Sequence, residues 1–104
     1  MVPSMIVVSG TITIDPANNT KMEALLDTLV SATVEEAGCV SYGMYLDHRS
    51  AGSWRVFEEW ASEAEMNAHM VTPHLAEFMT AMGDLGVTGV DLQRYDVAEK
   101  SKLM

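Results

Sequence analysis

Hydrophobic and polar residues follow two different spacings along this chain. In four segments apolar residues alternate with polar ones, or β-branched residues predominate, which predicts β-strands. These predicted strands span residues 5–14, 39–47, 54–60 and 87–97. One face of the third carries Trp54, Val56, Glu58 and Trp60. Gly10 inside the first strand indicates either a bulge, the commoner explanation, or a close approach of another group to the backbone.

The first helical pattern lies between the first two predicted strands. Apolar residues recur there at every third or fourth position, which predicts an amphipathic helix. Thr20 and Glu23 are spaced as a capping box, so we expect the helix to begin there. Gly38 supplies the left-handed residue that commonly closes such a helix.

A second helical pattern follows the third strand and is interrupted by a proline. Ser62 and Glu65 form another capping box, which predicts a short helix containing His69. Because proline is tolerated only in the first turn of a helix, Pro73 predicts a restart with Thr72 as the N-cap. The apolar positions of the restarted helix are Leu75, Phe78, Met79, Met82 and Leu85.

The order β-α-β-β-α-β predicts an α+β, ferredoxin-like fold with a four-stranded antiparallel sheet. Right-handed crossovers place both helices on one face of such a sheet. The other face would be left uncovered, although every strand has apolar residues on both sides. A second copy of the sheet could cover it, so we expect a homodimer in which two sheets form an α/β barrel.

Length and composition narrow the class of protein. The 104 residues are enough for one domain, which we place at 1–97, with a mobile C-terminal tail at 98–104. A net charge of -9 argues against nucleic acid or an anionic membrane as a partner. A single cysteine, Cys39, excludes an internal disulfide, and no apolar run is long enough to span a bilayer. We therefore expect a cytoplasmic protein.

Motifs of common cofactor sites are absent from the sequence. There is no G-x-G-x-x-G and no P-loop, so neither a nucleotide nor a flavin is expected. His69 and His74 are five residues apart across a proline, and no H-E-x-x-H occurs, so no metal site is expected either. Cys39 lies at a strand start with no base placed near it in the sequence, which argues against covalent catalysis.

Three short motifs resemble one family. They are E-x-W at Glu58–Trp60, A-H at Ala68–His69, and T-P-H at Thr72–His74. Together with the upstream segment E-A-G-C-V-S-Y at residues 36–42, they resemble the antibiotic biosynthesis monooxygenases, especially the quinol monooxygenases among them. The resemblance covers roughly residues 5–96. It implies a dimeric α+β barrel and a small aromatic substrate.

The resemblance also implies roles for individual residues. Catalytic roles fall on His69, His74 and Trp60, and substrate contacts on Tyr45, Tyr42, Glu58, Met66 and Phe78. A histidine suits a general base because its ordinary pKa lies near neutral pH. Tyr42 and Tyr45 point to opposite faces of their strand, so one could contact a ligand and the other the dimer seam.

Each of these residues also has a structural explanation. His69 could bond a backbone carbonyl at the edge of the core, and Trp60 could be a core residue whose N–H has found a partner. Glu58 could pair with Arg55 or Arg94, or accept backbone N–H bonds at the start of the second helix. The sequence leaves these alternatives open.

Three functions fit the resemblance. The first is a cofactor-independent monooxygenase that deprotonates a quinol or related phenol, whose anion then reduces O₂. The second is an isomerase of small hydroxy-ketones, as in autoinducer-processing relatives, and the third is a dimer that only binds an aromatic ligand. Haem degradation is not expected, because Gly10, His69 and Met79 occupy the positions of the haem-degrading Asn, Trp and His. Val56 replaces the actinorhodin-type asparagine, which argues against that polyketide substrate.

Overall fold

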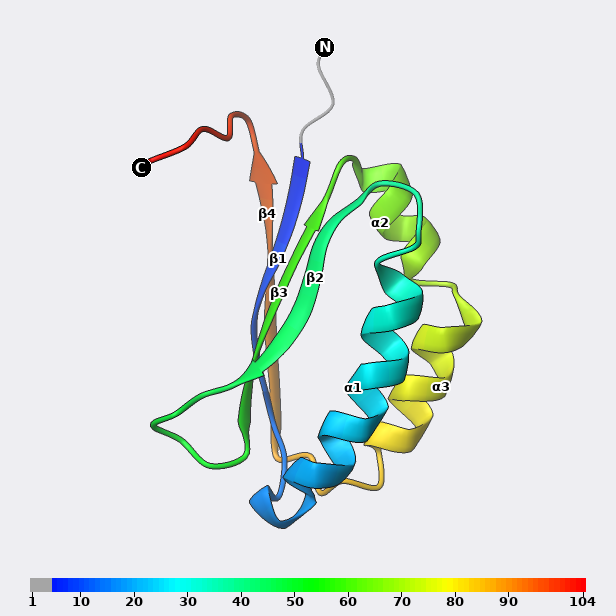
Figure 1. Ribbon diagram of the computed structural model, residues 1–104, viewed down its shortest axis with the longest axis vertical. Coiled ribbons are helices and arrows are strands. Elements are labelled where there is room, and N and C mark those ends of the chain that lie inside the picture. Colours follow the sequence, from blue (N-terminus) through cyan, green and yellow to red (C-terminus); the bar gives the residue numbers. More distant parts are fainter. Residues whose placement is uncertain (1–4) are drawn as a thin grey trace.

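A four-stranded antiparallel sheet carries a layer of helices on one face (Figure 1). The structure, a computed structural model, describes residues 5–104. Its elements are β1 (Met5–Thr13), the 3-10 helix η1 (Pro16–Asn18), α1 (Asn19–Thr33), β2 (Cys39–Leu46), β3 (Ser53–Trp60), α2 (Glu63–His69), α3 (Pro73–Met82) and β4 (Gly89–Val97). The strands lie in the order β2-β3-β1-β4. The predicted ferredoxin-like arrangement is therefore confirmed.

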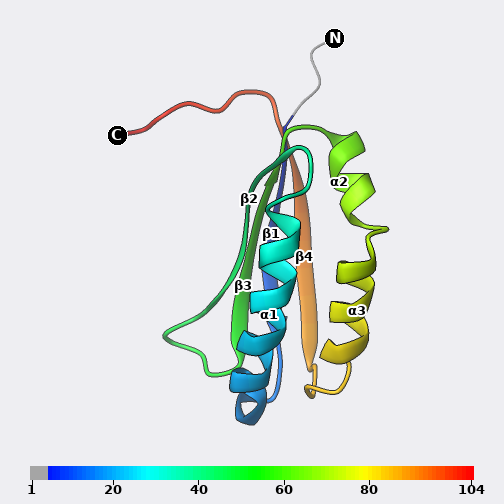
Figure 2. The same ribbon diagram turned by 45° about the vertical axis from the view of Figure 1, so that its right-hand side comes forward.

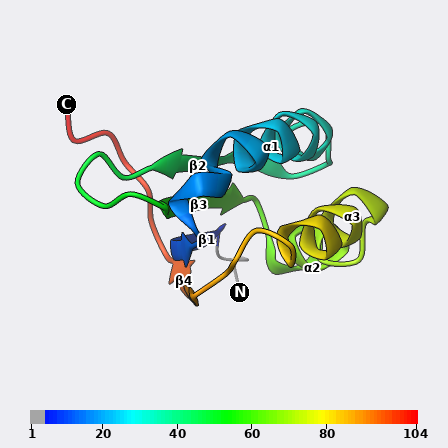
Figure 3. The same ribbon diagram turned by 90° about the horizontal axis from the view of Figure 1, so that it is seen from below.

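The core lies between the sheet and the helices, and strand β3 supplies its largest side chains. Trp54, Val56 and Trp60 are almost completely buried, and Glu58 is buried on the same face. The predicted alternation of this strand is thus confirmed. Figure 2 shows all the helices on this side of the sheet. Figure 3 shows α1 on the side of β2, with α2 and α3 beside it over the same face.

Helix α1 begins without the capping box that the sequence predicts. The Asp15 carboxylate accepts a hydrogen bond from the backbone N–H of Ala17 at 3.0 Å and so caps η1. This 3-10 turn runs directly into α1 at Asn19. Thr20 is therefore already inside the helix, and the prediction that Thr20 and Glu23 cap it is wrong. The earlier start arises because Asp15 caps η1 through the Ala17 N–H, and η1 leads straight into α1.

Helix α2 begins where the sequence places it. The Ser62 hydroxyl accepts a hydrogen bond from the Glu65 N–H at 3.3 Å, which confirms Ser62 as the N-cap. The same hydroxyl donates to the Glu65 carboxylate at 3.2 Å. Ser62 thus fixes the point at which the chain leaves β3 and turns over the sheet.

Gly10 marks a close approach of backbone, and the expected bulge is absent from its pairings. The register of β1 is continuous past Gly10 on both neighbouring strands. A Cβ atom at this position would lie 1.9 Å from the carbonyl oxygen of Asp91 and 2.8 Å from the Cα of Leu92. The irregularity in the sheet lies instead in β2, between Cys39 and Ser41.

The chain after β4 is joined to the sheet by an ion pair. Residues 98–104 form no helix or strand, and Lys100 Nζ lies 3.1 Å from Glu59 Oε2. None of the helices within residues 5–104 has the length and hydropathy needed to cross a membrane.

The sheet face opposite the helices presents aromatic side chains to solvent. Phe57, Tyr45 and Tyr95 come from three different strands, and all three are exposed. Their registers place them on the face opposite Trp54 and Trp60. An exposed apolar surface of this kind commonly forms an interface between copies of a chain.

We expect this face to form a homodimer. Light scattering at micromolar concentration should give twice the chain mass of 11.4 kDa. Phe57→Glu should shift the mass toward the monomer, because it places charge in the interface. Val71→Glu is the matched control, since Val71 is a highly exposed apolar residue beside the helices. A wild-type monomer, or equal effects of the two variants, would contradict the prediction.

Candidate active site

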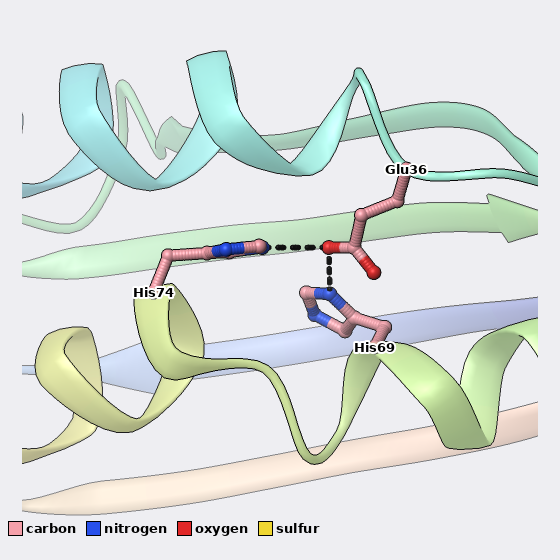
Figure 4. Close-up of side chains that lie close together, drawn as sticks. All are labelled: Glu36, His69 and His74. Carbon is pink, nitrogen blue, oxygen red and sulfur yellow. Dashed lines mark hydrogen bonds and ion pairs between the residues drawn. The ribbon is translucent and has the colours of Figure 1, made fainter.

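Three polar side chains from three separate segments converge beside the ends of α1 and α2. Glu36 comes from the loop between α1 and β2, His69 is the last residue of α2, and His74 lies in the first turn of α3. Oε2 of Glu36 lies 2.7 Å from Nδ1 of His69 and 2.7 Å from Nε2 of His74 (Figure 4). Two histidines therefore share one carboxylate oxygen.

The loop that carries Glu36 is held by backbone hydrogen bonds. Helix α1 ends at Thr33, and the Glu36 N–H donates to the Thr33 carbonyl at 3.0 Å. Gly38 then adopts a φ of +78°, which a residue with a side chain rarely adopts, and its carbonyl accepts from the Ala61 N–H at 2.8 Å. Gly38 thus ends the loop and does not cap the helix directly. These bonds fix where the Glu36 side chain begins.

The break between α2 and α3 positions the two histidines. Thr72 is the N-cap of α3 and Pro73 its first residue, as the sequence predicts. The Thr72 hydroxyl makes no forward cap bond; it donates to the carbonyl of His69 at 2.8 Å. The last turn of α2 is thereby tied to the first turn of α3. His69 and His74, five residues apart, consequently face the same carboxylate.

The shared oxygen determines how the imidazoles can act. A carboxylate accepts hydrogen bonds, so in the neutral imidazoles the N–H lies on Nδ1 of His69 and on Nε2 of His74. Nε2 of His69 and Nδ1 of His74 are then left with lone pairs that can accept a proton. Glu36 also carries the negative charge that stabilises whichever imidazole becomes cationic. The arrangement is suited to general-base catalysis.

Aromatic rings enclose His69. Its side chain is 1% exposed, and its ring centre lies 4.8 Å from that of Trp60 and 5.1 Å from that of Tyr42. Trp60 Nε1 donates to Glu58 Oε1 at 2.9 Å. Three of the residues expected at the site, Trp60, Tyr42 and Glu58, thus pack behind His69. Glu58 forms this bond instead of the arginine pairs considered from the sequence, since Arg94 pairs with Glu63 and Asp96.

Burial and neighbouring charge shift the pKa values of Glu58 and Tyr42, which pack behind His69. Burial raises the pKa of Glu58, and the hydrogen bond from Trp60 opposes this in part. Burial also raises the pKa of the Tyr42 hydroxyl, an effect reinforced by the negative charges of Glu58 and Glu36. Tyr42 therefore stays protonated and is an aromatic wall, not a base.

A groove of about 200 Å³ between α1 and α3 reaches His74. Its lining includes the apolar residues Leu25, Leu29 and Phe78. The His74 side chain is 22% exposed, in contrast to the buried His69. Of the residues expected to contact substrate, Phe78 lies in this groove. Met66 packs against the core instead.

Two residues differ from the site predicted from the sequence: Tyr45 lies outside the cluster, and Glu36 lies within it. Tyr45 is 60% exposed, with its ring over Gly43. It lines a hollow with Tyr42 beside α1 that Glu36, His69 and His74 do not line. Glu36 was not among the expected site residues. The available signal was the segment E-A-G-C-V-S-Y, which begins at Glu36 and carries part of the family resemblance.

The same three side chains also form a possible metal-ligand set. Glu36, His69 and His74 each offer one ligand atom, and these atoms lie within 4.8 Å of one another. The spacing of the two histidines along the chain predicts no metal site, because Glu36 joins them only in the folded chain.

The raised pKa of Glu58 predicts a pH-dependent effect on stability. When a carboxyl has a higher pKa in the folded state, the protein becomes less stable as the pH rises from the ordinary pKa of that carboxyl through the raised pKa. For Glu58 the ordinary pKa is 4.5. Glu58→Gln removes that charge and can still accept from Trp60. Its melting temperature should therefore rise relative to wild type between about pH 4 and pH 8.

Glu59→Gln is the matched control for this prediction. A hydrogen bond from Ser41 at 2.7 Å, together with Lys100, lowers the pKa of Glu59. Its charge therefore adds stability above the ordinary pKa, and this stability is lost as pH falls. The Gln variant should be less stable than wild type near pH 8, and the difference should shrink near pH 4. The same pH trend in both variants would contradict the assignment.

Comparison with known proteins shows which proteins this chain is similar to. The family model described as antibiotic biosynthesis monooxygenase matches residues 5–81. The Synechocystis sp. protein sll1783 is 33% identical over 98 residues, 94% of this chain and 67% of its own length. Rv0793 of Mycobacterium tuberculosis is 30% identical over 70 residues, 67% of this chain and 68% of its own length. A crystal structure from Deinococcus radiodurans superposes with a TM-score of 0.87 at 24% identity, covering 95% and 98% of the two chains.

Proposed function

Because this chain belongs to the antibiotic biosynthesis monooxygenase family, we propose that it is a cofactor-independent monooxygenase acting on a quinol or related aromatic phenol. The observation that carries the proposal is the pair of histidines on one carboxylate oxygen of Glu36. A phenol needs a base to become a good electron donor to O₂. This cluster supplies that base and a negative charge to stabilise its protonated form.

His74 is the base in this proposal. Of the two histidines, it is the one that lines the groove, whereas His69 is buried behind it. The phenolic proton passes to Nδ1 of His74, while its Nε2–H donates to Glu36. His69 makes the second bond to the same oxygen and so holds the carboxylate in place.

The groove would hold the aromatic ring. Leu25, Leu29 and Phe78 offer an apolar lining that suits a flat phenol. Its volume of about 200 Å³ lies below the ~300–1,000 Å³ of typical ligand pockets. The groove therefore suits a small phenol, or one ring of a larger fused system.

The reaction balances without a cofactor. The phenolate gives one electron to O₂, and the resulting phenoxyl radical and superoxide combine at a ring carbon. The peroxide anion formed there takes up a proton to become a hydroperoxide, which loses water and leaves a carbonyl on the ring. For a quinol the sum is quinol plus O₂ to hydroxyquinone plus water, so the substrate supplies all four electrons. The protein's part is to bind the ring, remove the first proton and return it.

Oxygen uptake by the purified metal-free protein tests this proposal. Reduced naphthoquinols and anthrols are the substrates, with catalase and a protein-free blank to account for autoxidation. We expect protein-dependent uptake and an oxygenated product, lost in His74→Gln and retained in His48→Gln, whose side chain is fully in solvent. No protein-dependent uptake across the panel, or conversion that persists without O₂, would overturn the proposal. The second result would indicate an isomerase.

A further inference from the structure

We propose that Glu36, His69 and His74 also bind a divalent transition-metal ion of the Zn²⁺ class, and that the bound ion turns the base off. The three ligand atoms come from the α1–β2 loop, the end of α2 and the start of α3. They lie within 4.8 Å of one another. Binding does not depend on the proposed reaction, whereas its effect on turnover rests on that function.

The distances are close to those of a three-ligand site. Imidazole nitrogens and carboxylate oxygens bind Zn²⁺ at roughly 2.0–2.2 Å, so two such ligands lie about 3–3.5 Å apart around the ion. Each histidine nitrogen is now 2.7 Å from Glu36 Oε2. An ion could enter if these two contacts lengthen by less than about 1 Å and the two histidine nitrogens, which lie within 4.8 Å of each other, approach to about 3.5 Å. Rotation about the side-chain bonds of Glu36 can move its carboxylate in this way while the backbone of the loop stays held.

The donor set selects the class of ion. Two imidazoles and one carboxylate suit Zn²⁺, Co²⁺, Ni²⁺, Cu²⁺ and Fe²⁺, whereas Mg²⁺ and Ca²⁺ prefer sites made of oxygen alone. Glu36 brings a negative charge, and buried Glu58 lies behind His69 in a chain with a net charge of -9. The electrostatic surroundings therefore favour a cation.

Solvent can reach one side of the cluster. His69 is fixed between Trp60 and Tyr42, which gives the site one rigid ligand. The side chains of Glu36 and His74 are 15% and 22% exposed. Water can therefore complete the coordination of an ion held by the three side chains, and the ion can enter without unfolding the core.

Metal binding would reverse the proton positions on the histidines. The ion takes Nδ1 of His69 and Nε2 of His74, which carry the protons in the neutral, metal-free cluster. In the neutral imidazoles the remaining proton then lies on Nε2 of His69 and Nδ1 of His74. Those atoms become donors, so neither can accept a proton from a phenol. Metal occupancy would consequently inhibit the reaction.

Titration of the metal-free full chain with Co²⁺ and Zn²⁺ tests the binding. We expect one Co²⁺ per chain with visible d–d absorption, and one Zn²⁺ by calorimetry. Glu36→Gln and His74→Gln should each weaken binding by at least about 100-fold, since even residues that only orient a ligand matter 10–100-fold. Glu35→Gln and His48→Gln should bind as wild type does, because both residues are exposed. Circular dichroism verifies that each variant is folded.

The outcomes separate this inference from the proposed function. Absence of stoichiometric binding, or binding unchanged in folded Glu36→Gln and His74→Gln, would overturn the site. When the substrate is a naphthoquinol that the protein oxidises, inhibition of its oxidation should follow Zn²⁺ occupancy and be reversed by EDTA. Binding without inhibition would overturn the blocking effect alone. Metal binding in a protein that oxidises no phenol would uphold the site and overturn the proposed function.

Discussion

Glu36→Gln is expected to lower kcat for phenol oxidation by about 10²–10⁴-fold, the range typical of a lost general-base function. Glutamine keeps the size of the side chain but removes the negative charge. The two histidine nitrogens that lie 2.7 Å from Oε2 would then face an amide. The amide does not stabilise the imidazolium that forms when His74 takes the phenolic proton. The initial rate of O₂ uptake at saturating substrate measures the effect.

Glu35→Gln is the control for this substitution. Glu35 is the preceding residue, carries the same charge and is exposed. The variant therefore makes the same change in net charge without touching the histidines, and it should retain wild-type kcat. A Glu36→Gln variant that folds and turns over within a few-fold of wild type would show that the carboxylate is not part of the base.

Gly10→Ala is expected to give the largest loss of stability, about 3 kcal/mol, at the upper end of the range for overpacked positions. The added Cβ would lie 1.9 Å from the Asp91 carbonyl oxygen. That neighbour is backbone, so no side-chain rotation can relieve the contact, and β4 would have to move away from β1. A loss of this size should lower the melting temperature by more than about 10 °C.

Gly89→Ala is the matched control in the same pair of strands. Gly89 pairs with Thr13 at the start of β4, and a Cβ there would meet nothing within 4 Å. Its melting temperature should stay within a few degrees of wild type, because the added Cβ has no neighbour to displace. Both variants make the same change in side chain, so they differ only in what surrounds it. Equal melting temperatures for the two variants would contradict the proposed close approach of β4 to Gly10.

Much of the fold could be predicted because it depends on local patterns. The alternation of Trp54, Val56 and Trp60 identifies the buried face of β3 without any knowledge of its neighbours. Pro73 likewise determines where the helix breaks, since its ring excludes it from a helix interior. The predicted capping box at Thr20 is wrong because Asp15, five residues earlier, accepts a hydrogen bond from the Ala17 N–H and starts the helical turn there.

The features that were missed depend on contacts between distant segments. Position 10 requires glycine because the backbone of its neighbouring strand β4, some eighty residues away in the chain, lies where a Cβ atom would be. Glu36 was expected inside a helix that reached Gly38, whereas the helix ends at Thr33. Only the loop conformation directs Glu36 toward His69 and His74, which the motifs had already indicated.

The most direct test of the account is the absorbance spectrum of a naphthoquinol bound to the metal-free protein without O₂. At a pH where the free phenol is protonated, the wild type should show the red-shifted band of the phenolate. His74→Gln and Glu36→Gln should bind the neutral phenol, and His48→Gln should behave as wild type does. A bound phenol that stays neutral in the wild type, or equal phenolate bands in all four proteins, would contradict the assignment of His74 as the base and of Glu36 as the carboxylate that supports it.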